Sequence, residues 1–242
     1  MTNVTSEENL RFESVTTSVG FDDMLDFTLP LNKPHFDTQI VVTNHEDWRT
    51  HAVANKHGAI LVITDLFSKN GRKFNKGAAI NAGFDHFQWF GWRAHVDADT
   101  VLPPEGRHVL FNRTTLDTNC IYGAERTNVQ GNDEINAYMD RLHPKHKEII
   151  SHSHRPVYQI WLDPIRHFCP IGYFQMWHAS KQKIYPYSRG NAAHDDVMFS
   201  AQWPEQHRRL LPTIKVHHIV MKEPVIGENW EGTRKQPRID IR

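Results

Sequence analysis

Residues 74–103, FNKGAAINAGFDHFQWFGWRAHVDADTVLP, carry the clearest structural pattern in the chain. Apolar residues recur every three or four positions through the first half of this stretch, which predicts a helix with one face against a core. Asn75 belongs to the residue types that cap helix starts. Residues 91–96 then predict a buried strand, which ends at the triplet Asp97-Ala98-Asp99. The prolines that follow end regular structure.

The triplet carries two acidic side chains. Alternation along an extended segment places Asp97 and Asp99 on one face. Two neighbouring carboxylates repel each other unless a cation lies between them. Hard divalent cations such as Mg²⁺ and Mn²⁺ take carboxylate oxygens together with substrate phosphates. The triplet therefore predicts a metal–diphosphate site, although a D-x-D at a strand end is also common as a solvated turn.

As a whole, the stretch resembles the GT-A class of glycosyltransferases, especially the family-2-like and β-1,4-galactosyltransferase-like members. In those proteins a Phe-Asn-(Lys/Arg) run leads into a helix with Asn and Gly, and a strand, a D-x-D and an apolar-Pro pair follow. The counterparts here are Phe74-Asn75-Lys76, Asn81, Gly83, Asp97-Ala98-Asp99 and Leu102-Pro103. The resemblance implies a single α/β domain with a Rossmann-like, mostly parallel sheet flanked by helices. It covers about residues 15–103 and 169–234.

The composition is that of a globular chain without a strong overall field. The sequence has 242 residues, of which 39% are hydrophobic and 23% charged. Its 28 basic and 28 acidic residues balance, so the chain as a whole does not attract nucleic acid or membranes. We expect Cys120 and Cys169 to be reduced, buried thiols. Neither a signal peptide nor a membrane span is expected, which favours a cytoplasmic protein.

Strands and helices alternate through the first half of the chain, which predicts a parallel sheet. Strands are expected at 14–18, 38–43 and 59–64, and helices at 21–27, stopped by Pro30, and at 44–56, closed by Gly58. Ligands of such sheets bind beyond the carboxyl ends of the strands. Polar residues stand at those ends, namely Thr17, Ser18, Thr43 and Asp65.

The resemblance assigns a nucleotide-sugar donor to this edge, with the nucleoside at the first three strand ends and the diphosphate at the D-x-D. The donor-binding residues that it implies are Thr17, Ser18, Thr43, Asp65, Lys76, Asn81, Asp97 and Arg234. Ordinary strand-end capping is an equal alternative for the first three. Arg234 follows from residues 229–234, NWEGTR, which echo the family's Asn-Trp-x-Gly-Arg tail with one residue inserted. Residues 12–104 would form the nucleotide-binding half and residues 105–242 the acceptor-binding half.

Two further motifs complete the site that the resemblance implies. Residues 194–199, HDDVMF, match the family's acidic motif, which is Glu-Asp or Glu-Asp-Asp at a helix start. Asp196 would be the base that takes the acceptor's proton. The change from Glu to Asp leaves the choice between Asp195 and Asp196 open. On a late strand at 215–219, His218 matches the family's metal-binding histidine better than His217. Asp97, Asp99 and His218 would then hold Mn²⁺ or Mg²⁺.

An apolar segment at 170–177 is either a core strand or a strand that lines the sugar cleft. The resemblance favours the cleft, with Gly172, Tyr173, Phe174 and Trp177 as its residues. Residues 105–160 are less informative, with a strand expected at 116–122 and a polar helical stretch at 132–151. Four histidines there, His143, His146, His152 and His154, fit no standard zinc spacing and are expected to be solvated.

We therefore expect a metal-dependent, inverting glycosyltransferase that uses a nucleotide-diphosphate sugar, with UDP as the expected nucleotide. A saccharide or glycoconjugate is the expected acceptor. Hydroxymethylated bases of viral DNA rank second, because the basic tail and the stretch at 132–155 could rim a cleft for a polyanion. A sugar-phosphate nucleotidyltransferase is the alternative enzyme, but residues 18–21 hold a single glycine and no glycine-rich loop. A non-catalytic module would not need the retained aspartates.

Overall fold

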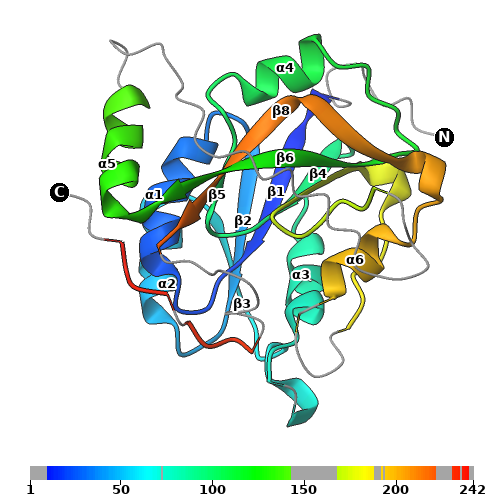
Figure 1. Cartoon of the computed structure of the whole chain (residues 1–242). Helices are drawn as coiled ribbons and strands as arrows, with labels where there is room; N and C mark the ends of the chain where they lie inside the picture. The colour runs from blue at the N-terminus through cyan, green and yellow to red at the C-terminus, as the bar shows by residue number, and fades with distance from the viewer. Residues whose placement is uncertain are drawn as a thin grey trace.

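One mixed sheet forms the centre of the molecule. The computed structural model describes residues 10–71, 73–142, 168–187, 192, 194–221, 231–234 and 236–239. Eight strands lie in the order β3-β2-β1-β4-β7-β6-β8-β5 (Figure 1). They are β1 (Phe12–Thr17), β2 (Thr38–Thr43), β3 (Ile60–Ile63), β4 (Trp92–Val96), β5 (Thr100–Val101), β6 (Ile121–Gln130), β7 (Phe174–His178) and β8 (Arg208–Val220).

The sheet is mostly parallel, as expected. The first four strands in the order run parallel to one another, and β6 runs parallel to β8. Only β7, between β4 and β6, and the short β5, beside β8, are antiparallel to their neighbours. The carboxyl ends of β1, β2, β3 and β4 therefore meet at one edge, which is where a ligand of such a sheet binds.

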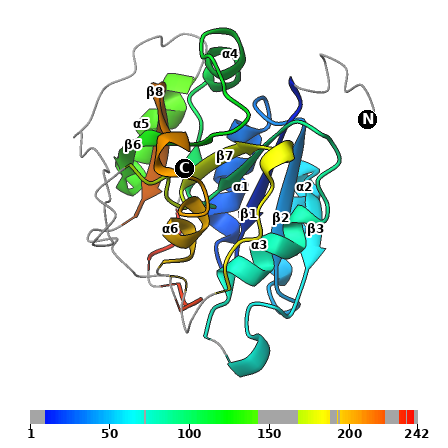
Figure 2. The same ribbon diagram turned by 90° about the vertical axis from the view of Figure 1, so that its right-hand side faces the viewer.

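Helices cover both faces of the sheet (Figures 1 and 2). They are α1 (Asp22–Asn32), α2 (Trp48–His57), α3 (Lys76–Phe84), α4 (Gly106–Asn112), α5 (Gly131–Leu142) and α6 (Asp195–Ser200), with short 3₁₀ turns at Lys69–Gly71, Ala179–Lys181 and Glu205–His207. On β2, Val41 packs with residues of α1 and α2, whereas Ile40 and Val42 pack with residues of α3. Successive side chains of β2 thus point to opposite faces of the sheet and contribute to two different core layers.

Small residues let α3 lie close to the sheet. A Cβ atom on Gly83 would stand 2.4 Å from a methyl carbon of Val15, so only glycine fits there. Asn75 caps the helix, since its side chain accepts a hydrogen bond from the main-chain N–H of Ala78 at 3.3 Å. The sequence predicted both features. In α2 the cap is Asp47, and Gly58 ends the helix with a φ of 69°.

Two predicted boundaries were wrong. Helix α1 continues past Pro30 to Asn32. Asn32 is buried there, and its side chain donates to the carbonyl of Thr100 and accepts from the N–H of Leu102, which ties the end of the helix to the segment after the D-x-D. The strand expected at 116–122 begins only at Ile121 and then runs to Gln130, because β8 pairs with it over that length.

Cys120 and Cys169 are free and buried, as predicted. Within the described residues, no helix is long and apolar enough to cross a membrane. Part of the predicted 132–151 helix is present as α5. Residues 143–151, the four histidines of the polar stretch, and Asn229 and Trp230 lie outside the described residues.

Candidate functional site

The D-x-D triplet lies in a tight turn that follows β4. The main-chain N–H of Asp97 donates to the carbonyl of Tyr173 at 3.2 Å, and that of Thr100 donates back to the carbonyl of Asp97 at 3.1 Å. On the other side, the carbonyl of Asp99 accepts from the N–H of Ile219 at 2.7 Å. Neighbouring strands β7 and β8 therefore fix the turn. This turn, and not strand alternation as expected, brings the two carboxylates into electrostatic contact.

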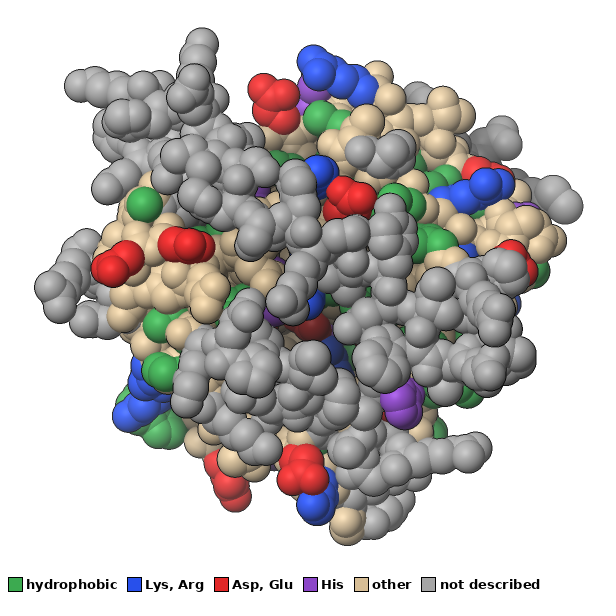
Figure 3. Space-filling view, in the orientation of Figure 1, with side chains coloured by type: hydrophobic (Ala, Val, Ile, Leu, Met, Phe, Trp, Pro, Cys, Tyr) green, Lys and Arg blue, Asp and Glu red, His purple; other side chains and the backbone are tan. Residues whose placement is uncertain are grey.

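Lys76, the first residue of α3, points into this turn. Its Nζ lies 2.5 Å from Oδ1 of Asp97, and both side chains are less than one third exposed. Burial works against the charge of the ammonium group, but the carboxylates of Asp97, Asp196 and Asp99 together outweigh it, so the pKa of Lys76 is raised. The lysine is therefore cationic at neutral pH. Figure 3 shows a recess in this face of the molecule, with basic, acidic and histidine side chains visible at its floor.

His218 meets the second carboxylate of the triplet. Its Nε2 lies 3.4 Å from Oδ2 of Asp99, and both side chains are largely buried. Burial opposes the charge of Asp99, but His218, Lys76 and Arg126 together hold its pKa below the ordinary value. The neighbouring His217 lies opposite Val101 of β5, and its side chain is on the other face of β8 from His218. Burial lowers the pKa of His217 to about 4. Of the two histidines, the structure brings His218 to the D-x-D.

The residues around Asp99 suit a hard divalent cation. Oδ1 of Asp99 and Nδ1 of His218 are both buried and have no hydrogen-bond partner among the residues that the structure describes. Carboxylate oxygen and imidazole nitrogen are ligands that Mn²⁺ accepts. Among the described residues, however, no three acidic, histidine or cysteine side chains are close enough to form a complete metal site. Asp97, the third predicted ligand, is bound to Lys76 instead.

The acidic pair at the start of α6 reaches the same place. Asp195 is buried, and its Oδ2 accepts from the main-chain N–H of Gly77 at 3.3 Å. Asp196 is partly exposed, and its two oxygens accept from the main-chain N–H groups of Gly172 at 2.7 Å and Val197 at 2.8 Å. Asp195 thus joins α6 to α3, whereas Asp196 is the carboxylate that a substrate can reach.

Gly172 lies against Asp196. A Cβ atom at this position would stand 3.2 Å from Oδ2 of Asp196 and 3.3 Å from its Cβ. The absent side chain makes room for Asp196. Phe174 and Trp177, also predicted to line the cleft, are fully buried in the core, where no sugar ring can stack on them. This part of the cleft prediction is corrected by the structure.

Tyr173 is also buried, and the cationic side chain of Arg126 lies against its ring. Its hydroxyl donates to the carbonyl of Ala124, and burial raises its pKa to about 12. The guanidinium carbon of Arg126, on β6, lies 5.1 Å from the centre of its ring. The sequence reasoning missed Arg126, because β6 brings it to the site from a stretch that carries no motif.

Acidic side chains gather at this place. Four carboxylates interact with one another or with shared neighbours, those of Asp97, Asp99, Asp195 and Asp196. Lys76, His218 and Arg126 are basic side chains that act on members of this group. An excess of carboxylates is the environment that a divalent cation prefers.

The predicted nucleoside contacts lie at the carboxyl ends of β1, β2 and β3. Oγ of Ser18 lies 3.4 Å from Oγ1 of Thr50, and the hydroxyl of Thr43 donates to Asp47 at 3.3 Å. For these two the capping alternative is present in the structure. Thr17 is buried at the end of β1. Asp65 is exposed, and its carboxylate has no hydrogen-bond or ion-pair partner in the part of the chain that the structure describes.

Asn81, which was expected to bind the donor, is hydrogen-bonded to the main chain of Tyr185. Its side-chain amide donates to the carbonyl of Tyr185 and accepts from the N–H of the same residue, both at 2.8 Å. These two hydrogen bonds hold the loop at 183–187 against α3. The same loop lies against the start of the helix, where a Cβ atom on Gly77 would collide with the carbonyl of Pro186.

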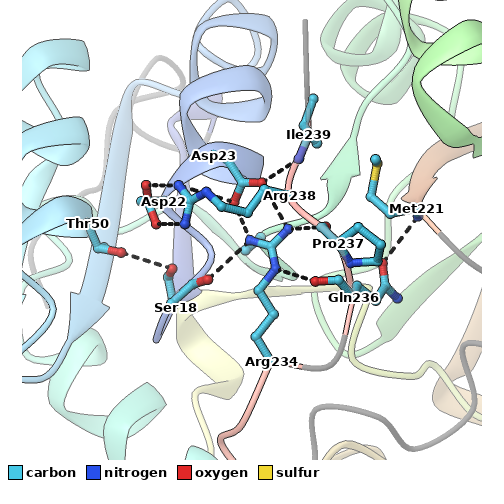
Figure 4. A network of polar contacts seen from close by, with 12 residues as sticks. Ser18, Asp22, Asp23, Thr50, Met221, Arg234, Gln236, Pro237, Arg238 and Ile239 are labelled. Atoms are coloured by element: carbon cyan, nitrogen blue, oxygen red, sulfur yellow. Dashed lines mark hydrogen bonds and ion pairs between the residues drawn. The ribbon is translucent and has the colours of Figure 1, made fainter.

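Arg234 is also fully engaged (Figure 4). An arginine has five N–H donors, and here they reach the carboxylate of Asp23 and the carbonyls of Gly20, Gln236 and Pro237. Arg238 pairs with the adjacent Asp22. We call residues 231–239 the C-terminal strap. Its other end contacts the loop before α3, where Glu231 pairs with Lys73 at 2.9 Å and Gly232 packs on Phe74.

Comparisons with known proteins identify the fold. No protein-family model matches the sequence, and no curated protein matches it. Among solved structures, TarS 1-349 of S. aureus in complex with UDP-GlcNAc is similar with a TM-score of 0.54 and 10% identity, over 93% of this chain and 61% of that one. The chain thus spans less than two thirds of the TarS fragment.

Two mycobacterial structures are similar over a larger share of their length. A mycobacterial protein matches with a TM-score of 0.52 and 14% identity, over 98% of this chain and 74% of that one. Glucosyl-3-phosphoglycerate synthase from Mycobacterium tuberculosis, in complex with Mn²⁺, UDP-glucose and glycerol 3-phosphate, matches with a TM-score of 0.51 and 11% identity, over 94% and 73%. At this level of identity the likeness shows the fold, which is the GT-A fold.

Proposed function

We propose that the protein is a metal-dependent glycosyltransferase that moves a sugar from a UDP-sugar to an acceptor hydroxyl. One observation carries the proposal. Lys76 contacts Asp97 of the D-x-D turn at 2.5 Å, and the main-chain N–H of the next residue, Gly77, donates to Asp195 of α6 at 3.3 Å, so two motifs far apart in the sequence meet at the start of α3. The similar structures that contain UDP-sugars support a UDP-sugar as the proposed donor.

The D-x-D turn would hold the cation together with the diphosphate. Asp97, Asp99 and His218 are the residues that would bind Mn²⁺ or Mg²⁺, which supplies positive charge to the departing diphosphate. Lys76 would provide a second positive charge, since its raised pKa keeps it protonated. Asp65, which is exposed and unpartnered among the described residues, is the best placed of the predicted nucleoside contacts.

Asp196 would take the proton of the acceptor hydroxyl as that oxygen attacks the anomeric carbon. Its two main-chain hydrogen bonds fix the carboxylate in one orientation, and its partial exposure leaves it accessible. A carboxylate that acts directly on the incoming hydroxyl implies a single displacement with inversion. Asp195 is buried against Gly77 and would position α6. Arg234 could contact phosphate, as the resemblance implies, only if the C-terminal strap moved and the bonds of Arg234 to Asp23 were broken.

The acceptor that we propose is a saccharide or glycoconjugate. Modified DNA receives less support, because Arg234 and Arg238, two cations of the basic tail, are paired with Asp23 and Asp22. A nucleotidyltransferase also receives less support. The main-chain N–H of Gly20, where such an enzyme binds phosphate, donates instead to the carboxylate of Asp47 at 2.7 Å.

The proposal is tested by incubating the protein with a panel of UDP-sugars and candidate acceptors, with and without Mn²⁺. Release of UDP and mass spectrometry of the acceptors measure the transfer. Asp196→Asn is expected to lower turnover by about 10²- to 10⁴-fold, whereas the exposed Asp85→Asn is the matched control. Absence of transfer and of UDP-sugar hydrolysis across the panel would contradict the proposal.

A further inference from the structure

Strand β6 presents a second polar group of residues to the D-x-D turn. In the pairing of β6 with β8, Arg126 lies opposite Val216, and Asn128 lies opposite His218. In the pairing of β8 with β5, His218 lies opposite Thr100. Residues directly opposite each other share a face of the sheet. Asn128, His218 and Thr100 therefore form one row across three strands. Arg126 lies on the same face of β6, two residues before Asn128, and Asp99 directly precedes Thr100.

Each of these five residues has a buried polar atom without a hydrogen-bond partner in the described parts of the chain. These atoms are Nε of Arg126, Oδ1 of Asn128, Nδ1 of His218, Oγ1 of Thr100 and Oδ1 of Asp99. Buried polar groups are normally hydrogen-bonded, because an unmet donor or acceptor loses its hydration without compensation. The atoms of Asp99 and His218 suit the cation described above, whereas Nε of Arg126 is an N–H donor that needs an acceptor.

The positive charge of Arg126 indicates that the ligand of this place is an anion. The guanidinium carbon of Arg126 lies 5.1 Å from the centre of the ring of Tyr173, so the guanidinium group is held against that ring. Yet no carboxylate lies within ion-pair distance of it in the described parts of the chain. By contrast, every donor of Arg234, another partly buried arginine, is satisfied. A fixed guanidinium with free N–H donors is suited to bind oxygens of a phosphoryl group in pairs.

We propose that Arg126, with Asn128 beside it, forms a subsite for a phosphoryl group. The inference rests on the proposed function, and it adds a phosphate ligand on the β6 side of the D-x-D. Tyr173, which supports the guanidinium, is the neighbour of Gly172, which holds Asp196. The phosphoryl group would thus bind next to both the D-x-D turn and the reactive carboxylate. It belongs either to the diphosphate of the donor or to a phosphorylated acceptor.

Calorimetric titrations with uridine, UDP and inorganic phosphate, in the presence of Mg²⁺, test the subsite without requiring turnover. The variants are Arg126→Gln, which removes the charge, and Arg126→Lys, which keeps the charge but loses the paired donors. Lys215→Gln is the matched control, because it removes a positive charge from the neighbouring strand. Lys215 directly precedes Val216, which lies opposite Arg126, so its side chain is on the other face of the sheet. There it pairs with Glu125 at 3.5 Å. Thermal unfolding verifies that each variant is folded.

Arg126→Gln should weaken binding of UDP or of phosphate by about tenfold or more, with Arg126→Lys in between and with uridine and the control variant unchanged. Weaker binding of UDP assigns the group to the donor. Loss of phosphate binding to the UDP-saturated protein assigns it to the acceptor. Wild-type affinity of Arg126→Gln for both ligands, or an equal loss in Lys215→Gln, would overturn the subsite. Phosphate binding that depends on Arg126 in a protein that does not bind UDP would instead contradict the proposed function alone.

Discussion

At the scale of single residues, the site depends on a few contacts between main chain and carboxylate. Asp196 is held by two N–H groups, and one of them belongs to Gly172. The sequence predicted the importance of both residues, but not that they touch, since residues 172 and 196 are joined only through folding. A glycine before an aromatic strand is compatible with sugar contact and with carboxylate contact. The structure shows the carboxylate contact.

We predict that Gly172→Ala lowers sugar transfer by about tenfold and leaves UDP binding unchanged. The added methyl group would stand 3.2 Å from a carboxylate oxygen of Asp196, so this side chain must shift by a few tenths of an ångström. Small displacements of a reacting group are costly for rate. Steady-state kinetics and a UDP titration measure the two effects.

Gly106→Ala is the control for that variant. Its Cβ atom would meet Leu102 at 3.3 Å, which is similar crowding, but in α4 and not beside Asp196. It should transfer sugar like the wild type. Equal rates for Gly172→Ala and wild type would show that Asp196 does not need its present position.

At the scale of elements, local pattern and long-range contact differ in how well the sequence predicts them. The cap at Asn75, the course of α3 and the strand before the D-x-D all follow from neighbouring residues, and the structure confirms them. The C-terminal strap does not follow from any local pattern. It crosses from Phe74 to the start of α1, and its anchoring partner, Asp23, lies more than two hundred positions away from Arg234.

We predict that Arg234→Ala lowers the free energy of unfolding by about 3 kcal/mol. Its side chain and that of Asp23 are 11% and 10% exposed, so the change leaves a buried carboxylate without a partner. Arg238 is 47% exposed, and Arg238→Ala should cost less than about 1 kcal/mol. Denaturant unfolding of both variants, and of Asp23→Ala with Arg234→Ala, measures the coupling. Equal costs for the two arginines would show that burial of the pair does not stabilise the strap.

At the scale of the whole molecule, the first half of the sheet was more predictable than the second. Strands β1 to β3 alternate with helices, so the hydrophobic pattern and the turn residues locate them. In the second half, β7 inserts antiparallel between β4 and β6, and β6 pairs with a strand that follows it by about eighty residues. This is why Arg126 escaped prediction although it faces the D-x-D.

Buried histidines make the stability of the whole fold depend on pH. Burial, reinforced by Arg107, lowers the pKa of His35 to about 4, and burial lowers that of His217 to the same value. Between pH 4 and 6.5 these side chains are protonated in the unfolded chain but not in the folded one. The unfolded state therefore binds more protons in this window, and stability rises with pH across it.

We predict that acidification from pH 7 to pH 4 lowers the free energy of unfolding, with a contribution from His35 of roughly 3 kcal/mol. In His35→Asn the amide can replace the ring nitrogen that accepts from the N–H of Arg107, so the pH dependence should become shallower by about that amount. The exposed His108→Asn should retain the wild-type slope. Urea unfolding at several pH values measures both. An unchanged slope in His35→Asn would contradict the assignment.

The most direct test of the central claim is a calorimetric titration of UDP in the presence and absence of Mn²⁺. If the D-x-D turn and His218 hold a cation together with a diphosphate, UDP binds tightly only with Mn²⁺. Asp99→Asn and His218→Ala should then lose the metal dependence, while the exposed Asp85→Asn retains it. Binding of UDP that is equally tight without the metal, or that survives in both site variants, would contradict the account, as would the absence of any UDP binding by the wild-type protein.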